Sequence, residues 1–131
     1  MAREVTTTGS KKLKTLMKQF NEHFQCLRIN IHSSNMAKKA EKGETIYRLD
    51  IEKTLSEVRE KKGSGKISLT GRKNVKTIEK EFDKIFGLYV QICWTASDGS
   101  RYYTTGSDDS KTLTVLNREK EAEGSQKGVW K

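Results

Sequence analysis

The side chains best suited to bind another molecule are lysines and arginines that gather in short stretches of the chain. The 131 residues include 26 Lys and Arg against 17 Asp and Glu, which leaves a formal net charge of +9 at pH 7. Cations of this kind neutralise phosphate groups, so the excess favours polyanions such as nucleic acid or an anionic membrane surface. A Lys-rich surface that only keeps the protein soluble fits the same charge, and the charge alone leaves both interpretations open. The clustered cations are Lys11, Lys12 and Lys14, then Lys38 and Lys39, and then Arg72, Lys73 and Lys76.

The last of these clusters lies where a helix is expected to begin. Apolar residues recur at steps of three and four across residues 75–86, which predicts an amphipathic helix. Backbone amides at a helix N-terminus are free to meet an anion. We therefore expect the strongest phosphate contacts from Arg72, Lys73 and Lys76.

No group of residues matches a catalytic or metal-binding motif. Residues 63–66 (GSGK) lack the surroundings of a phosphate-binding loop, and Asp108 and Asp109 are explained as capping residues of a helix. The two cysteines and two histidines have no partners at the spacings of metal ligands or of a nucleophile and its base. Pairing of a cysteine with a histidine in space stays open, but buried, reduced thiols are expected. We expect a non-enzymatic binding protein with no catalytic residues, no metal and no cofactor.

The elements that must position the cations occur twice. Residues 66–94 read as strand, helix and strand, and the N-terminal residues match them at a constant offset of 62. We interpret this match as an internal duplication. The prediction is a single compact α+β domain over residues 1–131, built of two tandem βαββα repeats at residues 1–65 and 66–131. The match aligns Gly9 with Gly71, Phe20 with Phe82 and Phe24 with Phe86.

The strands of both repeats are expected to form a mainly antiparallel sheet with helices on one face. In residues 27–32, apolar residues alternate with Arg28, Asn30 and His32, which predicts a strand with one buried and one solvent-exposed face. The other expected elements are return strands at 44–49 and 101–105, helices at 50–62 and 108–124, and a closing C-terminal strand at 127–131.

From residue 66 onward, the predicted order β-α-β-β-α-β is similar to the ferredoxin-like arrangement and so resembles the RNA-recognition-motif fold. That family binds RNA through aromatic side chains on its first and third strands, so the resemblance implies RNA binding on the sheet face. The third strand would lie in residues 99–106 (GSRYYTTG), which makes Arg101 and Tyr102 candidate contacts. Unlike that family, the first strand, residues 66–70, carries no aromatic residue.

A protein partner is the alternative to nucleic acid. Small α/β units expose sheet edges to which a partner can add a strand, and residues 3–8 and 127–131 are the expected edges. Trp130 would either pack into the core or anchor such an interface. The apolar runs stay well short of the roughly 20 residues that a membrane span needs, and no signal peptide is recognised. We therefore expect a cytoplasmic protein with no membrane partner.

Overall fold

The computed structural model describes residues 4–62 and 65–127, and within them the chain alternates short strands with helices. The strands are β1 (Glu4–Thr7), β2 (Arg28–Ser33), β3 (Ile67–Thr70), β4 (Leu88–Thr95) and β5 (Arg101–Tyr103). The helices are α1 (Leu13–His23), α2 (Met36–Glu41), α3 (Leu55–Val58), α4 (Val75–Phe86) and α5 (Leu113–Ala122), with a 3-10 turn, η1 (Gly106–Asp108).

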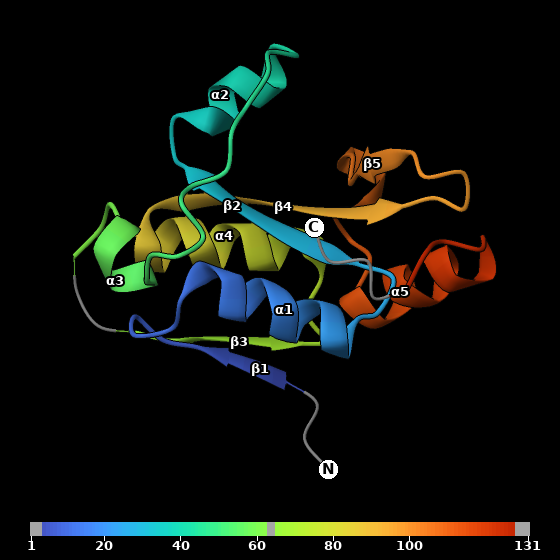
Figure 1. The fold of residues 1–131 in the computed structure, drawn as a ribbon, viewed down its shortest axis with the longest axis horizontal. Coiled ribbons are helices and arrows are strands. Elements are labelled where there is room, and N and C mark those ends of the chain that lie inside the picture. The colour runs from blue at the N-terminus through green and yellow to red at the C-terminus, as the bar shows by residue number, and fades with distance from the viewer. Residues whose placement is uncertain (1–3, 63–64, 128–131) are drawn as a thin grey trace.

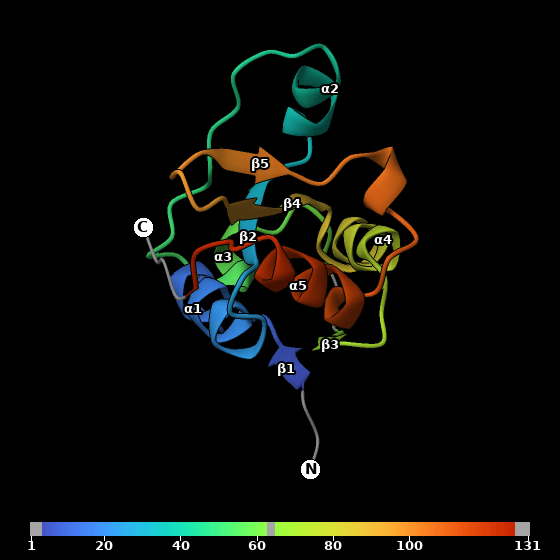
Figure 2. The same ribbon diagram turned by 90° about the vertical axis from the view of Figure 1, so that its right-hand side faces the viewer.

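The strands form two separate antiparallel sheets, one on each side of a layer of helices. β1 pairs with β3, and the larger sheet has the order β2-β4-β5. Helices α1, α4 and α5 lie between the two sheets, while α2 stands beyond the larger sheet (Figures 1 and 2). The mixed α+β class with antiparallel strands is confirmed. The prediction of one sheet with helices on one face is wrong, because β3 pairs with β1 and not with the strands of its own half.

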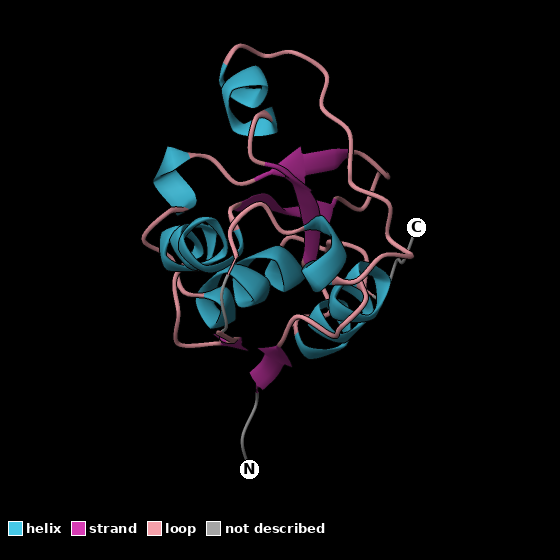
Figure 3. Ribbon diagram, turned by 90° about the vertical axis from the view of Figure 1, so that its left-hand side faces the viewer, coloured by secondary structure: helices cyan, strands magenta, loops and turns pink. Residues whose placement is uncertain are grey.

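The core fills the space between the helices and the larger sheet. The apolar stripes of α1 and α4 are buried, among them the rings of Phe20, Phe82 and Phe86. Apolar residues at alternate positions of β2 and β4 meet them from the sheet, as Ile29 and Ile92 do. Side chains alternate between the faces of a strand, so the polar residues of the same strands must point away from the helices. Figure 3 shows the helices and the two sheets from the end opposite to that seen in Figure 2.

The junction of α4 with β4 depends on a glycine. Gly87 ends the helix in the left-handed conformation, with φ of 68°. Residues 60–61 approach it closely, since the amides of Glu60 and Lys61 both donate to the carbonyl of Phe86, at 2.8 and 3.1 Å. A Cβ atom at residue 87 would lie 2.9 Å from Cγ of Lys61. Both the backbone angle and the close approach therefore favour glycine here.

The two glycines that the sequence aligns have closely similar surroundings. The carbonyl of Gly9 accepts from the amide of Ser56 at 2.8 Å, and that of Gly71 accepts from the amide of Thr114 at 3.2 Å. An added Cβ would lie 2.3 Å from the Ser56 hydroxyl oxygen in one case and 2.0 Å from the Thr114 hydroxyl oxygen in the other. Each glycine thus allows the first turn of a following helix to pack against the turn that leads into α1 or α4.

The predicted return strand at residues 44–49 does not form. The segment keeps one backbone hydrogen bond to β2, from the Leu49 amide to the Ile31 carbonyl at 3.1 Å. The Tyr47 carbonyl accepts from Nδ1 of His32 at 2.9 Å instead of from a strand amide. A side chain of β2 thus takes the place of a ladder partner, and the segment runs beside the edge strand β2 without forming a strand.

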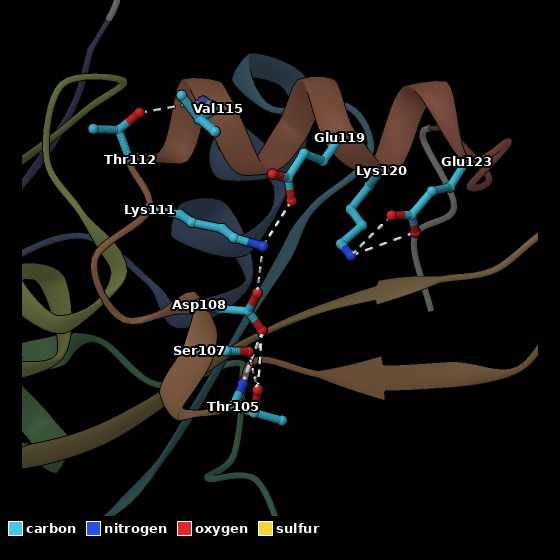
Figure 4. A network of polar contacts seen from close by, with 9 residues as sticks. All are labelled: Thr105, Ser107, Asp108, Lys111, Thr112, Val115, Glu119, Lys120 and Glu123. Carbon is cyan, nitrogen blue, oxygen red and sulfur yellow. Dashed lines mark hydrogen bonds and ion pairs between the residues drawn. The ribbon is translucent and has the colours of Figure 1, made fainter.

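The second helix of each half is shorter than predicted. Thr54 and Glu57 form a capping box that starts α3 at Leu55, and the extended backbone of Arg59 ends it after one turn. Residues 108–124 divide into η1 and α5, because Thr112 caps α5 by accepting from the Val115 amide (Figure 4). The predicted hairpin between β4 and β5 is confirmed.

Asp108 is the centre of a polar network that fixes η1 against α5. Its carboxylate accepts from the Thr105 amide at 2.9 Å and from Nζ of Lys111 at 3.0 Å, and Lys111 also binds Glu119 at 2.8 Å (Figure 4). Burial alone would raise the pKa of Asp108, but the Thr105 amide and the Lys111 ammonium outweigh it and hold the pKa below its ordinary value. These contacts assign Asp108 a structural role.

The expected closing strand at 127–131 falls, apart from Lys127, outside the described residues, and so does Trp130. At the other expected edge, β1 is paired with β3 along one side.

Candidate anion-binding site

The two cation clusters at the starts of α1 and α4 are far from forming one surface. β1 and β3 are antiparallel, with Glu4 opposite Thr70 and Thr7 opposite Ile67. The turns that follow the two strands therefore leave opposite ends of the pair, as Figure 1 shows. The structure does not bring Lys11, Lys12 and Lys14 together with Arg72, Lys73 and Lys76.

Several of these predicted cations already have protein partners. Lys14 pairs with Glu52 at 2.8 Å, and Lys73 pairs with Glu81 at 2.8 Å. Nζ of Lys11 donates to the side-chain carbonyl of Gln19. Such pairs reduce the charge available to a polyanion. Lys12, Lys38, Lys39, Arg72 and Lys76 are exposed, the second and third of them on α2.

The two candidates on β5 lie on opposite faces of the larger sheet. The Tyr102 ring stacks on Trp94 on the helix side, with ring centroids 6.3 Å apart. Arg101 is on the other face, where its Nε donates to the Thr95 hydroxyl at 2.9 Å. Of the two, Arg101 is directed toward a hollow in the sheet surface.

That hollow is a cavity of about 300 Å³ on the sheet face that points away from the helices. Its floor comes from alternate residues of β2, β4 and β5, and its wall comes from residues 46–48. Cross-strand pairing fixes the floor, because Asn30 is directly opposite Gln91 and Cys93 is opposite Tyr103. The lining residues are Asn30, His32, Ile46, Tyr47, Arg48, Gln91, Arg101 and Tyr103.

The polar face of β2 is covered, so the expectation of a solvent-exposed face is wrong. Arg28 and His32 are each 3% exposed, and Asn30 is 7% exposed. Residues 46–48 line the same hollow as Asn30 and His32, and the bonds from His32 to Tyr47 and from Leu49 to Ile31 hold them beside β2. Polar side chains that would otherwise be hydrated instead lie in or beneath a partly closed cavity.

The cavity is strongly cationic. Arg48 and Arg101 line it, and Arg28 is buried close to both. Burial lowers the pKa of the Arg28 guanidinium, and the positive charges of Arg101 and Arg48 lower it further. No Asp or Glu is among the lining residues in the described part of the chain. Like charges concentrated in this way favour an anion as the occupant.

His32 adds a titratable group to the cavity. Because the Tyr47 carbonyl can only accept, Nδ1 of His32 carries the proton in that bond, and Nε2 is left as a buried acceptor. Nε2 makes no hydrogen bond of normal geometry within the described residues. Burial lowers the pKa of His32, and the Arg48 charge acts in the same direction, while the Tyr47 carbonyl and the Gln91 amide oppose them. Together these effects hold the pKa of His32 below its ordinary value, which favours the neutral ring.

A second hollow, of about 280 Å³, lies between α4, α2 and the start of β4 and contains a perturbed carboxyl group. Burial and the nearby charge of Asp109 raise the pKa of Glu79 to about 7, while Lys76 acts in the opposite direction. No sequence signal pointed to this pair, because Glu79 is on α4 and Asp109 follows η1, and the two meet only in the fold. The residues that line this hollow hold both charge signs, so it is a weaker anion site than the first.

The raised pKa of Glu79 predicts a pH-dependent stability. Below the ordinary pKa of about 4.5, Glu79 is neutral in both the folded and the unfolded protein, and it does not destabilise the fold. Above about pH 7 it is charged in both, and the buried charge destabilises the folded protein in full. Allowing for solvent screening, we expect the free energy of unfolding of Glu79→Gln to rise by about 1–2 kcal/mol relative to that of wild type as the pH goes from about 4.5 to 8.

Urea unfolding at both pH values measures this difference. Glu22→Gln on the exposed surface of α1 is the matched control and should run parallel to wild type. Equal pH dependence of the Glu79→Gln and wild-type proteins would contradict the environment assigned to Glu79.

Sequence reasoning found Arg101 and missed Arg48, Tyr47 and His32. A usable signal was present for His32, because its strand carries Arg28 and Asn30 on the same face. For residues 46–48 there was none, since nothing in their order shows that they line a cavity. Among the residues that the structure describes, no three His, Cys, Asp or Glu side chains form a group that could bind a metal, and no helix has the length and apolar character to cross a bilayer.

Comparison of the chain with known protein families, curated proteins and solved structures found no match in any of the three. No activity or ligand can therefore be carried over from a relative. The chemistry of the cavity is the remaining guide to function.

Proposed function

We propose that the protein is a non-enzymatic binding protein that contacts the phosphates of single-stranded nucleic acid with the outer face of the β2-β4-β5 sheet. One observation carries the proposal: two guanidinium groups and two exposed tyrosine rings surround one cavity. The four residues are Arg48 and Arg101, and Tyr47 and Tyr103.

The two residue types supply complementary interactions. Arginine pairs with phosphate through charge and parallel hydrogen bonds, and aromatic rings stack on bases that are not paired. Tyr47 is 69% exposed and Tyr103 is 43% exposed, so both rings are available for stacking. Stacking of this kind requires unpaired bases, which favours a single strand over a duplex.

This site differs from the one that the sequence suggested. Arg101 belongs to both, but the lysines at the starts of α1 and α4 lie at opposite ends of the β1-β3 pair, and two of them, Lys14 and Lys73, are bound to carboxylates. We assign them a secondary role in the general attraction of a polyanion, which needs only net charge.

We also propose that the chain is a tandem duplication whose halves differ at the binding face. Leu49 donates to Ile31 at 3.1 Å, and Thr104 donates to Ile92 at 3.0 Å, which places residues 46–49 in the position of residues 101–104. In the second half this stretch includes β5, a regular strand of the sheet, whereas in the first half it forms the cavity wall. The difference between the halves supports a site that exists once.

The test is fluorescence anisotropy of labelled oligonucleotides of about eight nucleotides, titrated with protein at about 20 mM and about 150 mM salt. We expect micromolar binding of single strands at low salt, weaker binding of duplex, and a salt slope of about −2 that reflects two to three neutralised phosphates. Absence of binding at low salt would remove nucleic acid as the ligand, and affinity capture of a protein partner would then test the alternative of an edge-strand interface.

A further inference from the structure

We infer that the cavity on this face takes a phosphomonoester, and specifically the terminal phosphate of the nucleic-acid strand, rather than an internal phosphodiester. The inference rests on the proposed function and names the part of the ligand that the cavity receives.

The shape of the cavity is the first argument. Its floor is closed by Asn30 and Gln91, which are paired across β2 and β4, and one wall is closed by residues 46–48. A volume of about 300 Å³ is at the small end of ligand pockets. An internal phosphate needs room for the chain to continue on both sides, whereas a terminal phosphate needs only one way in. The hollow, closed below and walled on one side, has room for one compact phosphate group.

The charge of the cavity is the second argument. A phosphodiester carries one negative charge, while a phosphomonoester carries about −1.5 to −2 at neutral pH. Arg48 and Arg101 line the cavity, Arg28 adds a third positive charge nearby, and no Asp or Glu is among the lining residues that the structure describes. The concentrated positive charge matches a dianion better than a monoanion.

His32 is the third argument, because it can supply one more donor when the anion arrives. Its Nδ1 is committed to the Tyr47 carbonyl. Its buried Nε2 has no hydrogen bond of normal geometry in the described residues, and it gains a proton only if the ring becomes charged. The groups that face the ring are Arg48, the Gln91 amide and the Tyr89 ring, whose centroid is 5.7 Å away. None of them is a carboxylate, so a bound phosphate would be the negative charge that stabilises the imidazolium.

The experiment compares three oligonucleotides of one sequence, with a 5′-phosphate, with a 3′-phosphate, or with hydroxyl groups at both ends. We expect one phosphorylated form to bind about tenfold tighter than the hydroxyl form, in line with one added charged contact. A nucleoside monophosphate and inorganic phosphate serve as competitors. Displacement of the phosphorylated strand by the monophosphate supports the same cavity for both sources.

His32→Gln tests the coupling to proton uptake while keeping an amide donor at that position. Since the phosphate itself titrates near pH 6, the informative quantity is the ratio of wild-type to variant affinity at each pH. We expect this ratio to rise by about threefold or more as the pH falls from about 8 to about 6. A purely structural role for His32 would leave the ratio constant. Far-ultraviolet circular dichroism checks that the variant is folded.

The outcomes separate the two proposals. Equal affinity for all three strands, lost on removal of Arg48 and Arg101, would overturn the terminal-phosphate inference and leave the proposed function standing. Binding of the monophosphate with no binding of any strand would support the phosphomonoester cavity and overturn the proposed function. No binding of any of these probes would overturn both.

Discussion

Joint replacement of Arg48 and Arg101 by alanine is expected to weaken the binding of a single-stranded oligonucleotide by about a hundredfold or more. Each guanidinium lines the cavity, and hydrogen bonds to charged groups contribute about 1.5–3 kcal/mol apiece. Both side chains are exposed and lie outside the apolar core, so the fold should survive the change. Fluorescence anisotropy at low salt measures the loss, and the salt slope should become less steep by about one to two.

The matched control is Arg72→Ala with Lys76→Ala, which removes the same formal charge from exposed positions at the start of α4. General electrostatic attraction would make the two double variants equally weak. The cavity site requires a small effect, within about threefold, for the control. A larger loss in the control than in the Arg48 and Arg101 variant would place the binding site at the start of α4 instead.

Phe82→Ala is expected to lower the free energy of unfolding by about 3–5 kcal/mol. The Phe82 side chain is completely buried on α4, and its ring centroid lies 6.1 Å from that of Phe86. Truncation would remove these contacts and leave a cavity in the layer that joins α4 to the larger sheet. Because that sheet carries the proposed binding face, the loss should also weaken binding at temperatures where the variant begins to unfold.

Urea unfolding followed by circular dichroism measures the effect, with Val115→Ala as the control. Val115 is 45% exposed on α5, and its truncation should change the free energy by no more than about 0.5 kcal/mol. A loss below about 1 kcal/mol for Phe82→Ala would mean that the two phenylalanines of α4 do not form part of a tightly packed core.

The sequence predicted those elements whose local signals agree with their packing. α4 has an apolar stripe, a capping Asn74 whose side chain accepts from the Thr77 amide at 2.9 Å, and Gly87 at its end. Each of these signals lies within the helix or next to it, so each is visible in the order of residues. The strand expected at residues 66–70, found as β3 at Ile67–Thr70, and the β4-β5 hairpin were predicted on similar grounds and are confirmed.

The elements that the sequence mispredicted are those whose backbone groups bind distant parts of the chain. The helix expected at residues 50–62 ends early, and the amides of Glu60 and Lys61 bind the last carbonyl of α4. The strand expected at residues 44–49 loses a ladder bond to the His32 ring. Local propensity favoured the regular element in both cases, and a tertiary hydrogen bond replaced it.

The binding face was only partly predictable for the same reason. Arg101 was found because it lies beside aromatic residues on a strand. Arg48 lies in a stretch without regular structure, and only the fold shows that it shares a cavity with Arg101 and His32. The alternation in β2 correctly separated polar from apolar side chains, but it could not show that another segment covers the polar face.

The most direct test of the central claim is an amide chemical-shift titration of the isotope-labelled protein with a single-stranded oligonucleotide. We predict that the largest shifts fall on residues of the cavity floor and wall, around Asn30 to His32, Tyr47, Arg48, Gln91 and Arg101 to Tyr103. Shifts confined to the turns before α1 and α4, around Lys12 and Arg72, with the sheet face unmoved, would contradict it.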